Sequence, residues 1–186
     1  TKETADQIQQ GIAKEILRFH VLANSDSEED QKLKLEVKDR LVDYMKDILD
    51  GAEDVKETKK RITENQETIC LVAEQEIQKQ GYTYPVSVNL EKCYFPMKTY
   101  GDCTFPAGTY EALRVCIGKA KGRNWWCVLY PGLCFADSVN VIVPDEKKQE
   151  LKNILTEEEY ESLFDWREDD YQIRSGFLRL WRKLFA

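Results

Sequence analysis

The feature that most constrains the fold is a change of periodicity near the start of the chain. A short apolar run over residues 16–23, which carries the only histidine, His20, is typical of a buried strand. From Asp30 onward the apolar residues recur at steps of three and four, which indicates an amphipathic helix that ends near Gly51. The polar turn between the two segments therefore lies at a helix start, where unpaired backbone N–H groups need capping.

The rest of the pattern completes a mixed order of strands and helices. A second helical pattern covers about residues 55–80, and the period then drops to two, as is typical of half-buried strands. Such strands are expected at residues 86–90, 113–117 and 125–130. The order β-α-α-β-β-β predicts an α+β fold of two layers, in which both helices pack on one face of a roughly four-stranded sheet.

The composition changes beyond residue 143. Residues 144–170 contain 11 acids against 4 bases, whereas residues 171–186 contain four bases and no acid. We therefore expect an α+β domain over residues 1–143 and an acidic, then basic, amphipathic helical tail over residues 144–186. Three alternatives stay open for the basic part: it docks onto the domain, it contacts a membrane surface or a partner, or it is disordered.

The charge of the chain argues against general nucleic-acid binding. Its formal net charge is −7, whereas the neutralisation of phosphates needs a dense basic surface. A metal is not expected either, because the cysteines form no CxxC pair and the histidine is far from them in sequence. The loop GKAKGRN lacks the phosphate-loop pattern, so no nucleotide cofactor is expected.

Polar residues in and after the first turn form one candidate site. Asn24 and Asp26 can build the turn, and they can also orient a ligand. Asp30 and Lys34 are four residues apart, which suits an ion pair on one face of a helix. We expect the histidine to join Asn24, Asp26 and Asp30 in one polar network. The candidate residues of this segment are His20, Asn24, Asp26, Asp30, Gln31 and Lys34.

A basic and aromatic segment forms a second candidate site. Lys121 and Arg123 precede two consecutive tryptophans, Trp125 and Trp126, in a predicted strand. Because side chains alternate along a strand, the tryptophans must point to opposite faces, and at most one of them is expected in the core. The other faces the uncovered side or is covered by the C-terminal segment. An exposed tryptophan between basic residues would suit a partner anchor.

Four ordered blocks resemble the stage II sporulation protein R family of endospore-forming bacteria. They are the segment 18–41, KTYG at 98–101, PAGTYEALRVCIG at 106–118 and KGRNWWCVLYPGLC at 121–134. The resemblance implies a secreted signalling protein that acts between the two membranes separating forespore from mother cell. Its implied target is the membrane-embedded aspartic protease that processes pro-sigma-E, and its implied role is that of a ligand. The chain begins at Thr1 without Met, so an export segment is expected to precede it.

A cell-envelope hydrolase is the alternative function. In that interpretation His20 acts as a base, together with Cys134 or with Asp26. Such a site requires these groups to converge in an open cleft. The family resemblance, by contrast, implies no catalytic residue.

The six cysteines allow two bridges that would close hairpins in an exported chain. Cys127 and Cys134 flank one turn, and Cys93 and Cys103 flank another. An oxidising compartment would permit a disulfide at either pair. The alternative is that the cysteines remain buried thiols.

Overall fold

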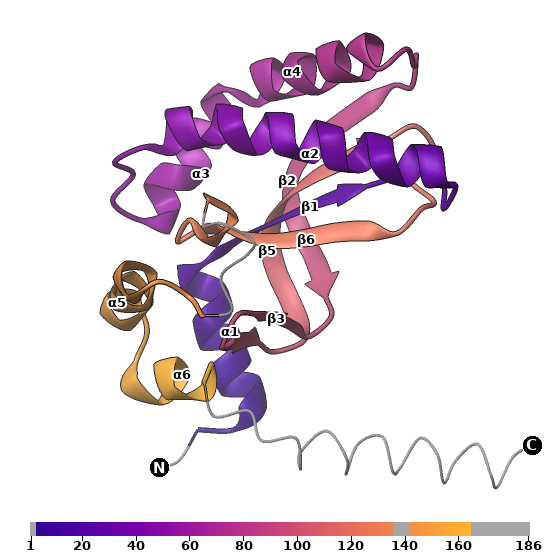
Figure 1. Cartoon of the computed structure of the whole chain (residues 1–186). Coiled ribbons are helices and arrows are strands. Elements are labelled where there is room, and N and C mark those ends of the chain that lie inside the picture. The colour runs from indigo at the N-terminus through magenta and orange to yellow at the C-terminus, as the bar shows by residue number, and fades with distance from the viewer. Residues whose placement is uncertain (1–2, 136–141, 165–186) are drawn as a thin grey trace, which may run out of the picture.

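A computed structural model describes residues 3–135 and 142–164 of the chain (Figure 1). Its helices are α1 (Ala5–Glu15), α2 (Glu28–Leu49), α3 (Val55–Glu64), α4 (Gln66–Lys79), the 3-10 helix η1 (Leu133–Phe135), α5 (Asp145–Ile154) and α6 (Glu157–Ser162). Its strands are β1 (Leu17–Leu22), β2 (Val86–Phe95), β3 (Lys98–Tyr100), β4 (Cys103–Phe105), β5 (Gly108–Ile117) and β6 (Asn124–Tyr130). The predicted α+β class is confirmed.

Strand β1 lies inside a four-stranded sheet of order β2-β5-β1-β6. It pairs parallel with β5 and antiparallel with β6. Because side chains alternate along a strand, Leu17, Phe19 and Val21 face α2, whereas Arg18 and His20 face the other side of the sheet. All residues of β1 are buried. The strand therefore carries two ionisable side chains into the interior.

The first core lies between the sheet and helices α2, α3 and α4 (Figure 1). Helix α2 begins after Ser27, whose side chain accepts a hydrogen bond from Asp30 N and caps the first turn. The predicted single helix over residues 55–80 is wrong, because Asn65 separates α3 from α4. The side chain of Asn65 donates a hydrogen bond to Arg61 O at 2.8 Å and accepts one from the Tyr44 hydroxyl at 3.2 Å. These side-chain contacts hold the break in place.

A second core covers the opposite face of the sheet, so helices do not lie on one face only. Helix α1 begins at a capping box formed by Thr4 and Gln7, and it buries Ile12 in this core. The β3–β4 ribbon adds Phe105. The amphipathic pattern of residues 5–15 is too short to predict a helix by itself, and without this helix the sequence predicts a single covered face.

Helices α5 and α6 belong to the second core as well. Helix α5 contributes Leu151. Leu155, which follows α5, and Leu163, which follows α6, pack in the same core. Gly11 of α1 lies against α6, since a Cβ atom at this position would meet the carboxyl group of Glu159. The domain boundary at residue 143 stays a prediction, and the basic segment 171–186 lies outside the described residues.

All six cysteines are free thiols. The predicted bridges Cys127–Cys134 and Cys93–Cys103 are therefore absent from the structure. Cys134 donates a hydrogen bond to the carbonyl oxygen of Val128 at 2.9 Å, and Cys103 is buried in the second core. Within residues 3–135 and 142–164, no helix is both long and apolar enough to cross a membrane.

Candidate functional site

The turn after β1 docks onto the loop between β5 and β6. We call the contact between residues 23–26 and residues 118–123 the turn–loop junction. Gly122 N donates to Ala23 O at 2.9 Å, and Lys121 N donates to Asn24 O at 3.2 Å. The side chain of Asn24 also accepts a hydrogen bond, at 2.9 Å, from the backbone N–H of Lys119. Segments almost 100 residues apart in sequence thus form one rigid surface.

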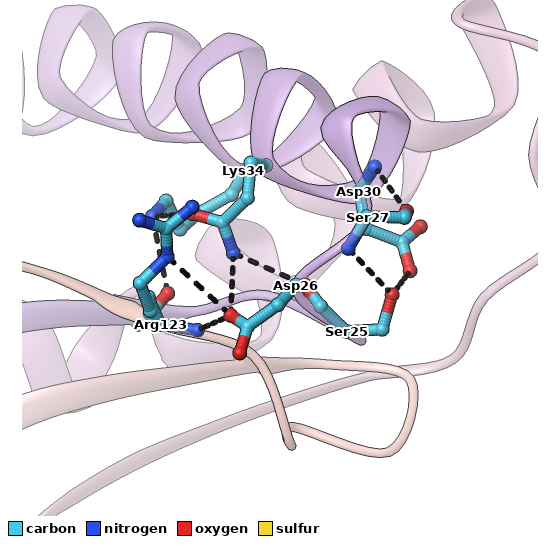
Figure 2. A network of polar contacts seen from close by, with 7 residues as sticks. Ser25, Asp26, Ser27, Asp30, Lys34 and Arg123 are labelled. Atoms are coloured by element: carbon cyan, nitrogen blue, oxygen red, sulfur yellow. Dashed lines mark hydrogen bonds and ion pairs between the residues drawn. The ribbon is translucent and has the colours of Figure 1, made fainter.

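Asp30 organises the turn side of the junction (Figure 2). Its Oδ2 atom accepts hydrogen bonds from Asn24 Nδ2 at 2.8 Å and from Ser25 Oγ at 2.6 Å. Its backbone N–H donates to Ser27 Oγ at 3.2 Å, which caps α2. Burial raises the pKa of Asp30, but hydrogen bonds from Ser25, Asn24, Tyr84 and Ser27 outweigh this and hold the pKa below its ordinary value. The carboxylate is therefore a fixed structural acceptor.

Lys34 joins helix α2 to the loop. Its Nζ atom donates to Gln31 Oε1 at 2.6 Å and to Arg123 O at 3.0 Å. Gln31 in turn donates to Ser25 O at 3.0 Å. Burial and the charge of Arg123 lower the pKa of Lys34, while Asp26 opposes this shift. The expected ion pair with Asp30 does not form, because Lys34 reaches across to the loop instead.

Asp26 and Arg123 form the exposed rim of the junction (Figure 2). The backbone N–H of Arg123 donates to Asp26 Oδ1 at 2.7 Å, and Arg123 Nε lies 3.5 Å from the same atom. The side chain of Arg123 is 74% exposed and that of Asp26 is 61% exposed. An exposed ion pair stabilises a fold by at most about 1 kcal/mol. The charges of this rim are thus presented to solvent, while backbone groups hold the loop.

Gly122 permits the close approach of the two segments. A Cβ atom here would lie 2.1 Å from Ser25 O and 2.9 Å from the Cβ atom of Ala23. We expect Gly122→Ala to lower the free energy of unfolding by about 1–3 kcal/mol, because a backbone segment must move to admit the methyl group. Chemical denaturation measures this loss. Ala120→Gly, which relieves a positive φ of 50° in the same loop, should cause no loss; equal losses for both variants would contradict the steric cause.

His20 is not part of the polar network, so that expectation is wrong. Its ring stacks on Trp126 at 5.1 Å between centroids and lies 4.9 Å from the ring of Phe95. Neither ring nitrogen has a hydrogen-bond partner among the described residues. Burial and the charges of Arg114 and Arg18 lower the pKa of His20 from 6.5 to about 4. The histidine is therefore a neutral core residue near neutral pH.

The groups of the alternative hydrolase site do not converge. Cys134 is bonded to a backbone carbonyl, and burial raises the pKa of its thiol well above the ordinary value. Asp26 is bonded to Arg123 on the surface, on another part of the molecule from the ring of His20. A base must lie within hydrogen-bond reach of the group that it activates. In the described part of the chain, no group of three His, Cys, Asp or Glu side chains could hold a metal ion.

The two tryptophans point to opposite faces of β6, as predicted. Trp125 packs edge-on against Phe19 at 5.5 Å, with Lys38 Nζ 5.1 Å from its ring. Trp126 packs in the second core against His20. Both are half-buried, so neither is the freely exposed anchor that the sequence suggested. The sequence predicted that one face of the sheet is uncovered, whereas the second core covers that face and partly buries Trp126.

Arg18 is an interior residue that sequence analysis missed. Its side chain is fully buried, and its guanidinium carbon lies 4.4 Å from the ring centroid of Phe95 and 4.9 Å from that of Tyr110. Nε donates to Cys127 O at 3.2 Å and Nη2 to the Tyr100 hydroxyl at 3.1 Å. The signal was present, because Arg18 alternates with apolar residues on a strand that is buried on both faces.

Comparison with known proteins connects this structure to one family. The family model described as Stage II sporulation protein R matches residues 13–140. The Stage II sporulation protein R of Bacillus subtilis (strain 168) is 35% identical over 157 residues, which cover 82% of this chain and 68% of that protein. No solved structure matches the chain. The chain therefore belongs to the stage II sporulation protein R family and is a sporulation protein.

Proposed function

We propose that this chain is an intercellular signal that binds and activates the membrane-embedded aspartic protease that processes pro-sigma-E. In this proposal it is secreted into the space between forespore and mother cell and acts as a ligand, without catalysing a reaction. Membership of the sporulation family supports the process. The observation that carries the ligand role is the turn–loop junction, a rigid surface with exposed charges and no converging catalytic groups among the described residues.

The junction is built in a way that suits recognition. Two buried side chains of α2 support it: Asp30 bonds to the turn and Lys34 to the loop backbone, so the surface shape is fixed before a partner arrives. A preorganised surface loses little conformational freedom on binding. Its exposed members include the cationic side chains of Lys119, Lys121 and Arg123. These cations stand out in a chain whose formal net charge is −7.

Activation by a ligand requires a difference in affinity between two states of the target. If this chain binds the active arrangement of the protease more tightly than the inactive one, binding shifts the population toward the active form. Such a ligand activates in proportion to the complex formed. An enzyme that modified the protease would instead act in amounts far below those of its target.

Reconstitution of the protease in lipid vesicles with the purified chain tests the proposal. We expect processing of pro-sigma-E to rise with the amount of chain added and to saturate near a fixed ratio of chain to protease. Full activation by a small catalytic fraction of the chain would rule out the ligand role. Processing that never responds to the chain would overturn the proposed function altogether.

Charge reversal at the exposed end of the loop should weaken the interaction. The double variant Lys121→Glu and Arg123→Glu is expected to lower the association rate about tenfold at low salt, because rim charges mainly steer encounter. The fold should persist, since the loop is held by backbone groups. Surface-immobilised protease measures the rate. The control Lys60→Glu and Lys79→Glu changes the net charge equally at exposed sites on α3 and α4; an equal effect there would show that only overall charge matters.

A further inference from the structure

The two edges of the sheet are protected differently. Strand β2, at one edge, carries the charged residues Glu91 and Lys92. Strand β6, at the other edge, reads NWWCVLY and contains no charged residue, no glycine and no proline. Exposed edges that lack such residues pair readily with other strands, and natural proteins usually block them. The composition of β6 is therefore typical of an edge strand that pairs with a strand of a partner.

The outer edge of β6 is open in the described structure. The strand is hydrogen-bonded to β1 alone, and residues 3–135 and 142–164 supply no further backbone-to-backbone hydrogen bond to it. In an antiparallel pair, alternate residues of an edge strand turn their N–H and C=O groups outward. Cys134 bonds to Val128 O and covers the far end of the strand. The open part is thus residues 124–127.

A hollow of about 560 Å³ lies along this open part. Trp125, Trp126 and Cys127 contribute to its lining from the strand. Helix α2 lines one side through Val42 and through the charged residues Lys38, Asp39, Asp43 and Lys46. The turn that follows β3 and residues 142–144 also line it. Ile142, which lines this hollow, is 59% exposed. Its volume is in the range of sites that bind ligands.

The residues that line the hollow and the charges beside it define which kind of ligand can bind there. We propose that the open edge of β6 accepts an extended segment of a partner protein as an additional strand. Side chains of an added strand alternate between the α2 side and the side of residue 142. The set that faces Ile142 and Val143 must be apolar, whereas the set that faces α2 meets Val42 together with charged side chains and can include polar residues. The loop at residues 119–123 lies at the start of β6 and has three cations and no acid. The segment therefore carries acidic residues at the end that meets this loop.

A second copy of the chain fits this site less well. Its own β6 would supply apolar side chains, but that strand contains no acidic residue to meet the basic loop. Charge complementarity at strand ends favours a different partner. This inference concerns a mode of binding, so it stands or falls separately from the proposed activation of a protease.

Hydrogen exchange of the isotope-labelled full chain tests the proposal with peptide probes. The probe is the capped peptide Asp-Asp-Val-Thr-Val-Ile-Val, together with its reversed sequence, because the added strand can run in either direction. At about 1 mM peptide, we expect every second backbone N–H among residues 124–127 to exchange about tenfold more slowly. The other amides in this stretch already bond to β1. This alternation distinguishes strand addition from side-chain docking.

Two control peptides and one pair of variants sharpen the test. Replacing both acids of the peptide with lysine should weaken binding about tenfold. Replacing its threonine and the valine that follows with proline should abolish binding, because one of two adjacent N–H groups must face β6 and proline cannot donate to a ladder. Ile142→Lys should weaken binding about fivefold. Tyr94→Lys, at a side chain 66% exposed on the opposite edge strand, should leave binding unchanged.

Four results would overturn the proposal. The first is slow exchange of all amides among residues 124–127 in the free chain, since the edge would then be paired already. The second is no added protection there with either acidic peptide. The third is protection without alternation, and the fourth is equal binding of the lysine peptide. None of these measurements involves the protease, so failure of the activation experiment leaves this test intact.

Discussion

Replacing Arg18 with lysine is expected to lower the free energy of unfolding by about 3 kcal/mol. The guanidinium group is fully buried, packs between aromatic rings and donates to Cys127 O and to the Tyr100 hydroxyl. Hydrogen bonds from charged groups contribute about 1.5–3 kcal/mol each, and the planar guanidinium stacks on rings in a way that an ammonium group does not. Lysine would also place a strongly hydrated charge in an apolar site. Urea denaturation at neutral pH measures the loss.

Two further variants identify the cause of that loss. Arg123→Lys is the matched control, because the Arg123 side chain is 74% exposed, and its effect should stay within about 0.5 kcal/mol. Arg18→Met keeps the length of the side chain and removes the charge. It should be more stable than Arg18→Lys, because it avoids burying an ammonium group. A loss below about 1 kcal/mol for Arg18→Lys would contradict the role assigned to the aromatic rings of Phe95 and Tyr110 around the guanidinium group.

Local sequence patterns were sufficient for the elements next to the candidate site. The apolar run of β1, the cap at Ser27 and the apolar stripe of α2 are all decided by residues close in sequence. The break at Asn65 was not readable, because it depends on a hydrogen bond from Tyr44, which belongs to another helix. The cover on the second sheet face was missed for a similar reason. Its apolar residues come from short segments at both ends of the chain.

The candidate site could be predicted in part. The polar residues Asn24, Asp26 and Asp30 indicated the turn, because such residues at a helix start build turns and cap the helix. The partner of this turn could not be predicted, since Lys119 N reaches Asn24 across 95 positions of sequence. The register in which β1 pairs with β5 and β6 decides whether these two segments meet. The same limit applies to His20, whose membership of the second core follows from which face of β1 packs on which helices.

A loss of stability in mild acid is the second large effect expected, and it comes from His20. The pKa of His20 is about 4 in the folded chain, against 6.5 for an unperturbed imidazole, because burial and the nearby Arg114 and Arg18 disfavour the charged ring. The folded state therefore binds fewer protons than the unfolded state between these values. As the pH falls from 6.5 to about 4, the free energy of unfolding should decrease by about 3 kcal/mol through this group.

The variant His20→Phe separates this effect from the titration of carboxyl groups. Phenylalanine keeps an aromatic ring against Trp126 and Phe95 but cannot bind a proton, so the stability of the variant should depend less on pH between 6.5 and 4 by about 3 kcal/mol. The ring can also be observed directly, because the chain has one histidine. Its proton resonances should not titrate above about pH 5. A midpoint near 6.5 in the folded protein would show that the ring is hydrated, and the stacked interior position assigned to it would then be wrong.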